Sequence, residues 1–550
     1  MEEVYRNLWT ALMRYGAPGL AAVLLLRCLW PLLWHRQTAF VWAWLECANG
    51  QRLAVRHWEN CIGRGRRSDV RVDFPTVSRS HAVLTRYDDG SWTVTEAASA
   101  GITVNGEFVT IQALQDGDVI GLGGVELTFH TQQMQADKPP AAGRWRAAAD
   151  VCLLTVLQFC LCVAGLLADR TQAMSLILGF GGLAALQWVL LTAYFLMDRP
   201  AFEVETLAFF LSTMGMAVIA VVSAAELGKQ LLAVVLGVAA FQVTGWSMRS
   251  LERAKGFRYL AAVAGMALLA VTLLFGETYY GAKNWLMLGG VSLQPSELAK
   301  VCFVYVGASP MERLMKKRNL VLLIAYTVAL CGLLALMNDF GTALVFFSAF
   351  LLIAYLRSGS IGTVALALTA LLFAGVIGLH LAPHALRRLQ TWRHIWEDPL
   401  GAGYQQTRAL MSIASGGLFG LGMGNGKMRQ IFAADSDMVF ATVAEEWGLV
   451  MAVLCVLCIV VPALFSVKCA RYSRSSFYAI GSCTAAGILL VQTMLNVLGT
   501  VDVLPLTGVT FPLLSNGGSS MVGVWALLAF IKAADNRPGG SFAVKRSRNG

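Results

Sequence analysis

The stretch VMAVLCVLCIVVPALF occupies residues 450–465 and contains no charged side chain. A helix needs about 20 mostly apolar residues to cross the hydrocarbon core of a bilayer, and this stretch belongs to a longer apolar segment of that kind. Cys455 and Cys458 have the CxxC spacing of some metal and redox sites, but no second pair accompanies them. The favoured interpretation is therefore a membrane-spanning helix with two packed thiols.

The overall composition extends this interpretation to most of the chain. Of the 550 residues, 57% are hydrophobic and 14% are charged, and the mean hydropathy is +0.61. Soluble globular proteins carry about a quarter charged residues, so disorder, a collagen-like fibre and a purely soluble enzyme are excluded. Most of the 12 cysteines lie in apolar runs, and we expect free thiols.

The apolar runs predict a polytopic α-helical membrane protein with about 13 spans. The predicted spans are 18–34, 147–168, 173–197, 204–224, 230–247, 259–276, 295–310, 319–336, 340–357, 362–383, 437–465, 477–499 and 508–532.

Lysine and arginine residues predict the orientation of the chain in a cytoplasmic membrane. The cationic loops Met248–Arg258, Met311–Asn319 and Ser466–Ser475 fall on one side, together with the basic end Lys545–Arg548. Short cationic loops stay in the cytoplasm, so the long loop His384–Asp437 is predicted to lie outside. The net charge of +10 is then explained by these cytoplasmic loops, and it does not indicate nucleic-acid binding.

Residues 36–131 have a different character, with short alternating strands separated by turn signals such as Asn105-Gly106. This pattern predicts a small cytosolic all-β sandwich. The predicted organisation is an N-terminal anchor at 1–35, the sandwich at 36–131, a linker at 132–146, two additional spans at 147–199, a membrane core at 200–533 and a basic cytosolic tail at 534–550.

Three sandwich loops carry groups suited to binding a phosphate and the peptide next to it. They contain Arg64, then Ser78 and Arg79, then Asn105. Their order and spacing resemble the forkhead-associated (FHA) domain, a reader of phosphothreonine peptides. The resemblance implies that Arg64 and Ser78 contact the phosphate, Arg79 assists and Asn105 binds the peptide backbone. Val104 stands where several readers carry a hydroxyl, so an unphosphorylated partner remains the alternative.

Polar residues at span boundaries are the candidate membrane site. Glu297 and Lys300 are spaced i,i+3 after Pro295, so they share a helix face, either as a structural ion pair or as part of a wet cavity. Asp339 either caps the following helix or belongs to the same cavity. In the outer loop, Arg387, Arg388 and Arg393 suit an anionic group such as a lipid-linked pyrophosphate.

Six further polar or glycine-containing motifs follow along the chain. They are Gly281–Trp285, Gln294–Lys300, Asn338–Thr342, Trp396–Gln405, Gly416–Gly426 and Phe511–Ser520. The glycine series lacks the strand–turn–helix context of a nucleotide site.

Together these motifs resemble the SEDS family (shape, elongation, division and sporulation), typified by FtsW, RodA and SpoVE, over about residues 200–533 as a ten-span core. The resemblance implies polymerisation of peptidoglycan glycan strands from lipid II, with a class B penicillin-binding protein as partner. It implies Asp398 as the catalytic residue. The implied substrate-binding residues are Trp285, Glu297, Lys300, Asp339, Arg387, Arg388, Arg393, Gln405 and Ser519.

Three positions depart from the family pattern and leave a specialised or inactive relative open. Asn338, Asp435 and Asn516 replace the usual Pro, His and Tyr. One carboxylate acting as general base would suffice for the chemistry, and no cofactor is required, although a divalent cation (Mg or Mn) would help a pyrophosphate leave. A flippase for lipid-linked precursors and a non-catalytic, phosphorylation-dependent scaffold are the alternative functions.

Overall fold

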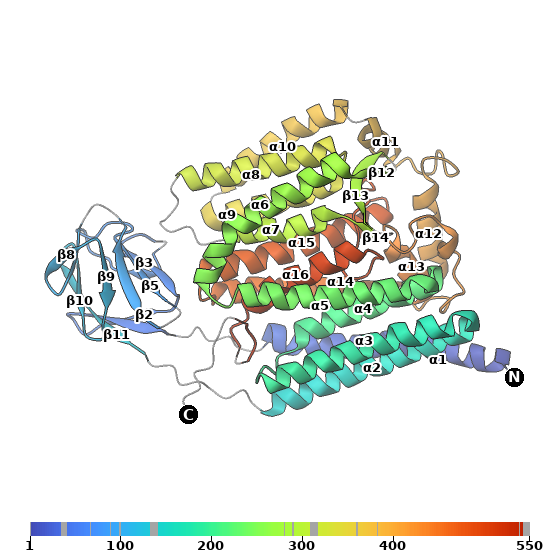
Figure 1. Ribbon diagram of the computed structural model, residues 1–550, viewed down its shortest axis with the longest axis horizontal. Coiled ribbons are helices and arrows are strands. Elements are labelled where there is room, and N and C mark those ends of the chain that lie inside the picture. The colour runs from blue at the N-terminus through green and yellow to red at the C-terminus, as the bar shows by residue number, and fades with distance from the viewer. Residues whose placement is uncertain are drawn as a thin grey trace.

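The computed structural model describes residues 2–34, 41–66, 68–87, 90–97, 101–132, 141–279, 281–288, 291–308, 317–358, 361–381, 383–537 and 539–542. A long bundle of helices forms one body, and a β-sandwich lies beyond one end of it (Figure 1). The N-terminal end of the chain lies at the end of the bundle away from the sandwich.

The helical body contains sixteen α-helices within the described residues. They are α1 (Glu2–Leu29), α2 (Ala141–Ala168), α3 (Ala173–Leu196), α4 (Glu203–Val222), α5 (Leu227–Ser247), α6 (Leu251–Phe275), α7 (Pro295–Ala308), α8 (Lys317–Leu336), α9 (Phe340–Ser358), α10 (Ile361–Leu381), α11 (Pro383–Thr391), α12 (Tyr404–Gly416), α13 (Val439–Glu446), α14 (Gly448–Arg471), α15 (Ser476–Thr500) and α16 (Gly518–Ala533).

Nine helices in the described part of the chain are long and apolar enough to cross a membrane, and three more are apolar but shorter. A multi-pass membrane protein is thereby supported, while the number of about 13 spans stays a prediction. Helix α4 is the most enclosed of the nine, because 89% of its most apolar 18-residue stretch is buried. It lies at the centre because helices α2, α3, α5 and α16 pack around it.

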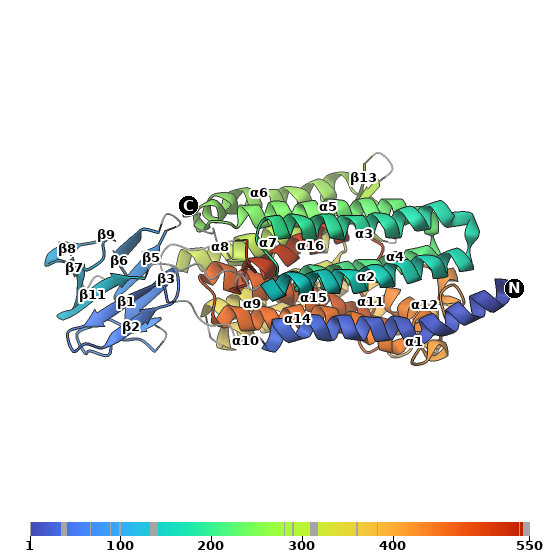
Figure 2. The same cartoon turned by 90° about the horizontal axis from the view of Figure 1, so that it is seen from below.

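The N-terminal helix lies along the side of the bundle and contacts α2 and α14 (Figure 2). Arg27, the one cation in the apolar part of this helix after Pro18, pairs with Asp150 of α2, whose side chain is 2% exposed. Arg146 also donates to the Arg27 carbonyl oxygen at 2.8 Å. A charge inside an apolar helix is costly unless it is paired, and this pairing explains how α1 tolerates an arginine.

The sandwich consists of two sheets that enclose an apolar core. One sheet has the order β2-β1-β11-β10-β7-β8 and the other β4-β3-β5-β6-β9. Inward residues such as Leu45, Leu84 and Phe129 are fully buried. The strands are β1 (Ala43–Cys47), β2 (Arg52–Val55), β3 (Glu59–Gly63), β4 (Val70–Arg71), β5 (Ala82–Arg86), β6 (Trp92–Glu96), β7 (Ile102–Val104), β8 (Glu107–Val109), β9 (Ile111–Leu114), β10 (Val119–Leu122) and β11 (Val125–Thr131).

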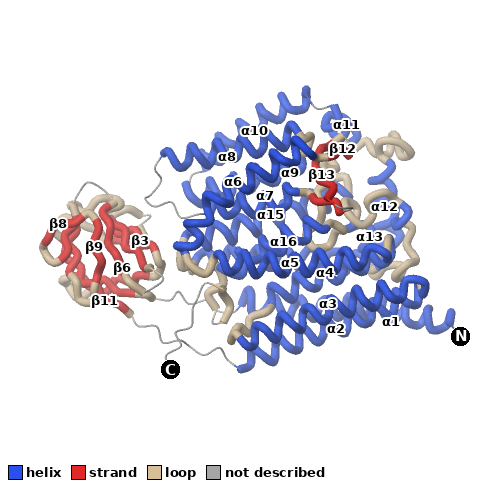
Figure 3. Tube along the Cα trace, viewed as in Figure 1, coloured by secondary structure: helices blue, strands red, loops and turns tan. Residues whose placement is uncertain are grey.

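A third, small sheet was not expected from the sequence. Strands β12 (Glu277–Tyr279), β13 (Ala282–Leu288) and β14 (Val291–Leu293) form it between α6 and α7. It lies at the end of the bundle opposite the sandwich (Figure 3).

Several predicted boundaries differ from those in the structure. The predicted span 437–465 is divided, because Gly448 has a φ of +91° and separates α13 from α14. Helix α2 begins at Ala141, within the predicted linker, and α16 begins at Gly518. The predicted tail folds back as far as Phe542, which is 4% exposed. The basic residues Lys545–Arg548 lie outside the described residues.

Candidate active site and phosphopeptide site

Asp398 lies in an exposed turn between α11 and α12, at the end of the bundle away from the sandwich. Its Oδ1 accepts from the Gly401 N–H at 3.0 Å and its Oδ2 from the Ala402 N–H at 2.9 Å. The turn is tight, since the Gly403 N–H also donates to the Asp398 carbonyl oxygen at 3.0 Å. A carboxylate has about four acceptor positions, so the two capping bonds leave it able to accept a substrate hydroxyl.

The three outer-loop arginines have different surroundings. Arg387 and Arg388 lie on α11 and are exposed. Arg388 donates to the Leu506 carbonyl oxygen at 3.2 Å. Arg393 has a φ of +63° and lies over the Trp392 ring, with 5.2 Å between guanidinium carbon and ring centroid.

Arg388 also faces a carboxylate that was absent from the predicted site. Asp437 precedes α13, and a Cβ atom built on Gly508 would lie 3.5 Å from Asp437 Oδ2 and 3.8 Å from Arg388 Nη1. Both side chains therefore lie close to Gly508, and Arg388 is near enough to Asp437 to act on it electrostatically. Burial raises the pKa of Asp437 to about 6, with the positive charge of Arg388 opposing this shift and the charge of Asp435 adding to it.

This raised pKa gives a pH-dependent prediction. An aspartate in an unfolded chain titrates near 3.9, so the contribution of Asp437 to stability is complete below about pH 3.9 and is lost as the pH rises through about 6. Asp437→Asn cannot ionise, and we expect it to unfold at a higher temperature than the wild type at pH 7.5. The difference should vanish near pH 4. A less stable variant at pH 7.5 would mean that attraction to Arg388 outweighs burial.

Glu297 and Lys300 form a buried ion pair on α7. Lys300 Nζ lies 2.7 Å from Glu297 Oε2, and the two side chains are 2% and 5% exposed respectively. Asp339 lies near enough to interact electrostatically with both. It also caps α9, because its Oδ1 accepts from the Thr342 N–H at 3.0 Å. Its Oδ2 is buried without a hydrogen-bond partner among the described residues.

The loop between α15 and α16 connects these two clusters. Thr507 and Val509 pack against Gly341, two residues after Asp339. Gly508 of the same loop lies close to both Arg388 and Asp437. Residues 507–509 of this loop therefore lie beside both the region of the buried ion pair and the arginine–aspartate pair of the outer loop.

The remaining predicted substrate residues lie around this region. Ser519, on the first turn of α16, accepts from the Gln294 N–H at 3.0 Å and so joins α16 to the chain entering α7. Gln405 donates from Nε2 to the Phe432 carbonyl oxygen at 3.3 Å. Trp285 lies on β13 opposite Glu277. Their contacts with a substrate stay predictions.

Two of the three departures from the family pattern contact each other. Asn516 donates from Nδ2 to Asp435 Oδ2 at 2.8 Å, and its backbone N–H donates to the Asp435 carbonyl oxygen at 2.7 Å. The side-chain Nδ2 of Asn516 also donates to Glu226 Oε2 at 3.0 Å. The third, Asn338, donates to the Gly281 carbonyl oxygen at 3.2 Å. The Asp435 and Asn516 replacements are therefore mutually compatible.

A pair of buried glutamates holds the glycine-rich loop. Glu446 accepts from the N–H groups of Gly424 at 2.6 Å and Gly426 at 3.0 Å, and Glu445 accepts from the Met428 N–H at 2.7 Å. Burial raises the pKa of Glu446 to about 7, against the lowering effect of the two backbone hydrogen bonds. The loop is thus fixed to the end of α13.

Two of the three sandwich loops named from the sequence lie side by side. The Arg64 N–H donates to the Ser78 carbonyl oxygen at 3.0 Å, and the Gly65 N–H donates to the Arg79 carbonyl oxygen at 2.9 Å. Buried His81 supports this arrangement by accepting from the Ser78 N–H at 3.1 Å through Nδ1. The side chains of Arg64 and Arg79 remain exposed.

Asn105 lies in the turn after β7 and has a φ of +52°. Its amide nitrogen donates to Asp118 Oδ1 at 2.9 Å, and its oxygen accepts from the Val119 N–H at 2.9 Å. Both ends of the side chain therefore hold the turn together, and the peptide contact of Asn105 stays a prediction.

The acidic residues do not form a ready-made metal site in the part of the chain that the structure describes. No three His, Cys, Asp or Glu side chains there are grouped as ligands of a metal ion would be. The divalent cation considered from the sequence therefore has no ligand cluster among the described side chains.

Comparisons with known proteins agree with both parts of the chain. Residues 200–537 match the FtsW/RodA/SpoVE cell cycle proteins, and residues 60–123 match the FHA domain. The peptidoglycan glycosyltransferase RodA of Mycobacterium tuberculosis is 31% identical over 325 residues, which cover 55% of this chain and 69% of that protein. A probable peptidoglycan glycosyltransferase FtsW of Aliivibrio salmonicida is 34% identical over 276 residues, covering 47% and 67%.

A solved structure of a peptidoglycan synthase complex, described for its coordination of polymerization and crosslinking, contains a similar chain. The TM-score is 0.50 at 26% identity, with 60% of this chain and 96% of that chain covered. The protein belongs to the FtsW/RodA/SpoVE family and carries an FHA domain at its N-terminal side.

Proposed function

We propose that the protein is a membrane-embedded peptidoglycan glycosyltransferase that polymerises glycan strands from lipid II during cell division, elongation or sporulation. The observation that carries this proposal is the position of Asp398. Two backbone N–H groups orient its carboxylate in an exposed turn. The turn lies at the end of the bundle opposite the FHA domain (Figure 1).

In the proposed reaction Asp398 acts as general base. A sugar hydroxyl of one substrate attacks the anomeric carbon of the other, the new C–O bond forms as the bond to pyrophosphate breaks, and the hydroxyl proton passes to the Asp398 carboxylate. Arg387, Arg388 and Arg393 supply positive charge for the departing pyrophosphate. The Glu297–Lys300 pair and Asp339 would shape the inner wall of the site.

Purified full-length protein incubated with lipid II separates this proposal from its two rivals. A polymerase produces glycan chains, a flippase moves lipid II across the bilayer without polymer, and a scaffold does neither. Polymer formation that depends on Asp398 would support the proposal, whereas translocation alone would replace it.

We further propose that the FHA domain lies in the cytoplasm and the Asp398 loop outside. In a cysteine-depleted background, Leu400→Cys and Phe108→Cys place thiols at side chains that are 80% and 84% exposed. An impermeant thiol reagent added to intact cells should label position 400 and spare 108. Labelling of 108 alone would reverse the orientation.

The FHA domain is proposed to bind a phosphothreonine protein. We expect Arg64→Ala to abolish binding of a phosphothreonine peptide, because loss of a charged phosphate contact costs about 2–4 kcal/mol. The fold should survive, since the loop is held by the backbone N–H of Arg64. Calorimetric titration of the full chain measures this, with exposed Arg66→Ala in the same loop as the matched control. Equal losses for both variants would contradict a specific pocket.

The proposed assembly partner is a class B penicillin-binding protein. The support is the similar chain in the solved peptidoglycan synthase complex. Co-purification of such a partner with the full chain tests the proposal independently of the FHA domain.

A further inference from the structure

The FHA domain meets the helical body along a defined seam. His57 Nδ1 lies 2.5 Å from the Ser473 carbonyl oxygen, and the Trp58 N–H donates to the Arg474 carbonyl oxygen at 2.5 Å. The Trp58 ring stands edge-on to Tyr478 at 6.1 Å, and the Arg474 guanidinium lies 5.7 Å from the Trp58 ring centre. The segment leading into β3 therefore docks on the turn between α14 and α15.

A cavity of about 330 Å³ lies beside this seam. The FHA domain contributes Ala54, Arg56, His57, Asn60 and Asp69, and the helical body contributes Arg471 and Tyr472. Because the lining comes from both parts, a molecule bound here would hold them together.

The charges around the cavity favour an anion. Arg56 and Arg471 are exposed, and neither guanidinium has a hydrogen-bond or ion-pair partner among the described residues. His57 faces the Ser473 carbonyl, which can only accept, so Nδ1 carries a proton. The one acid, Asp69, is engaged by the Cys61 N–H at 2.8 Å. Two unpaired guanidinium groups therefore face the cavity together with one acid whose carboxylate already accepts a hydrogen bond.

The position of the cavity along the membrane axis identifies the anion. Arg471 is the last residue of the apolar span Gly448–Arg471, and the ends of spans lie among lipid headgroups. Basic pockets at this depth bind anionic headgroups. We infer that the cavity binds the phosphate of an anionic phospholipid from the leaflet next to the FHA domain. This site is separate from the Arg64 loop, which follows the other end of β3.

Photo-crosslinking of the full chain with a photoactivatable phosphatidylglycerol in nanodiscs tests this inference. Crosslinks should map to peptides covering residues 54–60 and 471–472. Arg56→Gln combined with Arg471→Gln should weaken binding about 10- to 30-fold, given the contribution of each cation near an anionic surface. The paired Lys substitutions should retain most binding. Arg249→Gln, an exposed cation outside the cavity, should bind like the wild type.

Each other outcome overturns the inference. Unchanged crosslinking of the double Gln variant would show that the cavity is not the site. Equal capture of zwitterionic phosphatidylcholine would show that headgroup charge is not recognised. Displacement of the lipid by millimolar inorganic phosphate would assign the same chemistry to a small soluble phosphate. None of these readouts depends on glycan polymerisation or on the phosphopeptide pocket.

Discussion

Asp398→Asn should reduce glycan polymerisation by about 10²- to 10⁴-fold, the usual cost of removing a general base. The amide cannot take up the hydroxyl proton, although it has nearly the same shape as the carboxylate. The measurement is the rate of polymer formation from lipid II by the purified variant in detergent or liposomes.

The structure makes the control for this experiment necessary. Both oxygens of Asp398 cap backbone N–H groups, and an asparagine has only one oxygen to accept them. A cap is worth about 1 kcal/mol, so the turn will weaken slightly. Thermal unfolding and membrane insertion should stay close to wild type. Exposed Glu397, which contacts His394 at 2.9 Å, provides the matched control Glu397→Gln with near-normal activity. A fully active Asp398→Asn variant would reduce Asp398 to a turn residue.

Lys300→Met should destabilise the protein by about 3–5 kcal/mol, because removing one partner of a buried ion pair leaves an uncompensated charge. Glu297 would then lie beside Asp339 without a cation, and both carboxylates are buried. A lower unfolding temperature of the purified protein reports this loss.

The double variant Glu297→Gln with Lys300→Met separates a structural role from a substrate role. Both charges disappear together, so stability should return towards that of the wild type. If the pair shapes the substrate site, the double variant stays folded but forms little polymer. Normal polymerisation by the folded double variant would show that the pair is only structural.

Local sequence patterns predicted the helices and loops that are determined by residues close together in the chain. Apolar runs located most spanning helices, and the spacing of Arg64, Ser78 and Arg79 located the two sandwich loops that come together. The division at Gly448 was missed because it depends on distant contacts. A side chain there would collide with the backbone at Leu418 and Phe419. The pattern of apolar residues does not indicate that the backbone at Leu418 and Phe419 lies so close to Gly448.

The active-site region was predicted less completely for the same reason. Asp398 and the Glu297–Lys300 pair stand in short recognisable motifs. Asp437 and Arg388 are 49 positions apart, and both lie close to Gly508 of the α15–α16 loop. Asp435 and Asn516 were each noted as departures, but their hydrogen bond joins segments 81 positions apart.

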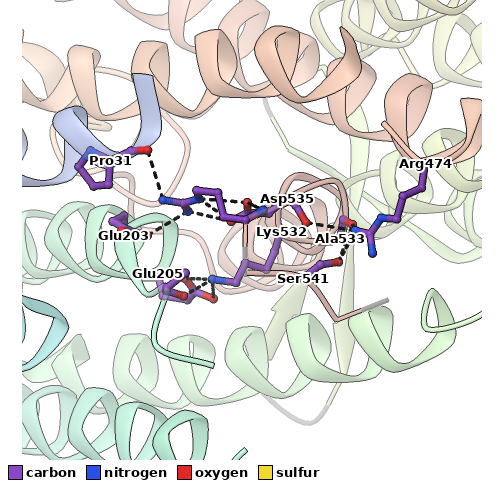
Figure 4. A network of polar contacts seen from close by, with 10 residues as sticks. Pro31, Glu203, Glu205, Arg474, Lys532, Ala533, Asp535 and Ser541 are labelled. Carbon is purple, nitrogen blue, oxygen red and sulfur yellow. Dashed lines mark hydrogen bonds and ion pairs between the residues drawn. The ribbon is translucent and has the colours of Figure 1, made fainter. Parts of the chain in front are cut away.

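The end of the bundle next to the FHA domain contains a network that joins early and late parts of the chain (Figure 4). Arg537 contacts Glu203, Asp535 and the Pro31 carbonyl oxygen, the last of these 506 positions away. Lys532 pairs with Glu205 at 3.0 Å, both side chains being fully buried. Contacts between such distant positions form late, since a long loop must close first.

This network has a consequence for biogenesis. While the ribosome is still translating α16, Glu203 and Glu205 have already been made but lack Arg537 and Lys532 as partners. The N-terminal helices can therefore enter the bilayer early, but they form these ion pairs with the core only after residue 537 has left the ribosome. A translational stall before that point would leave inserted but loosely assembled protein for membrane quality-control proteases.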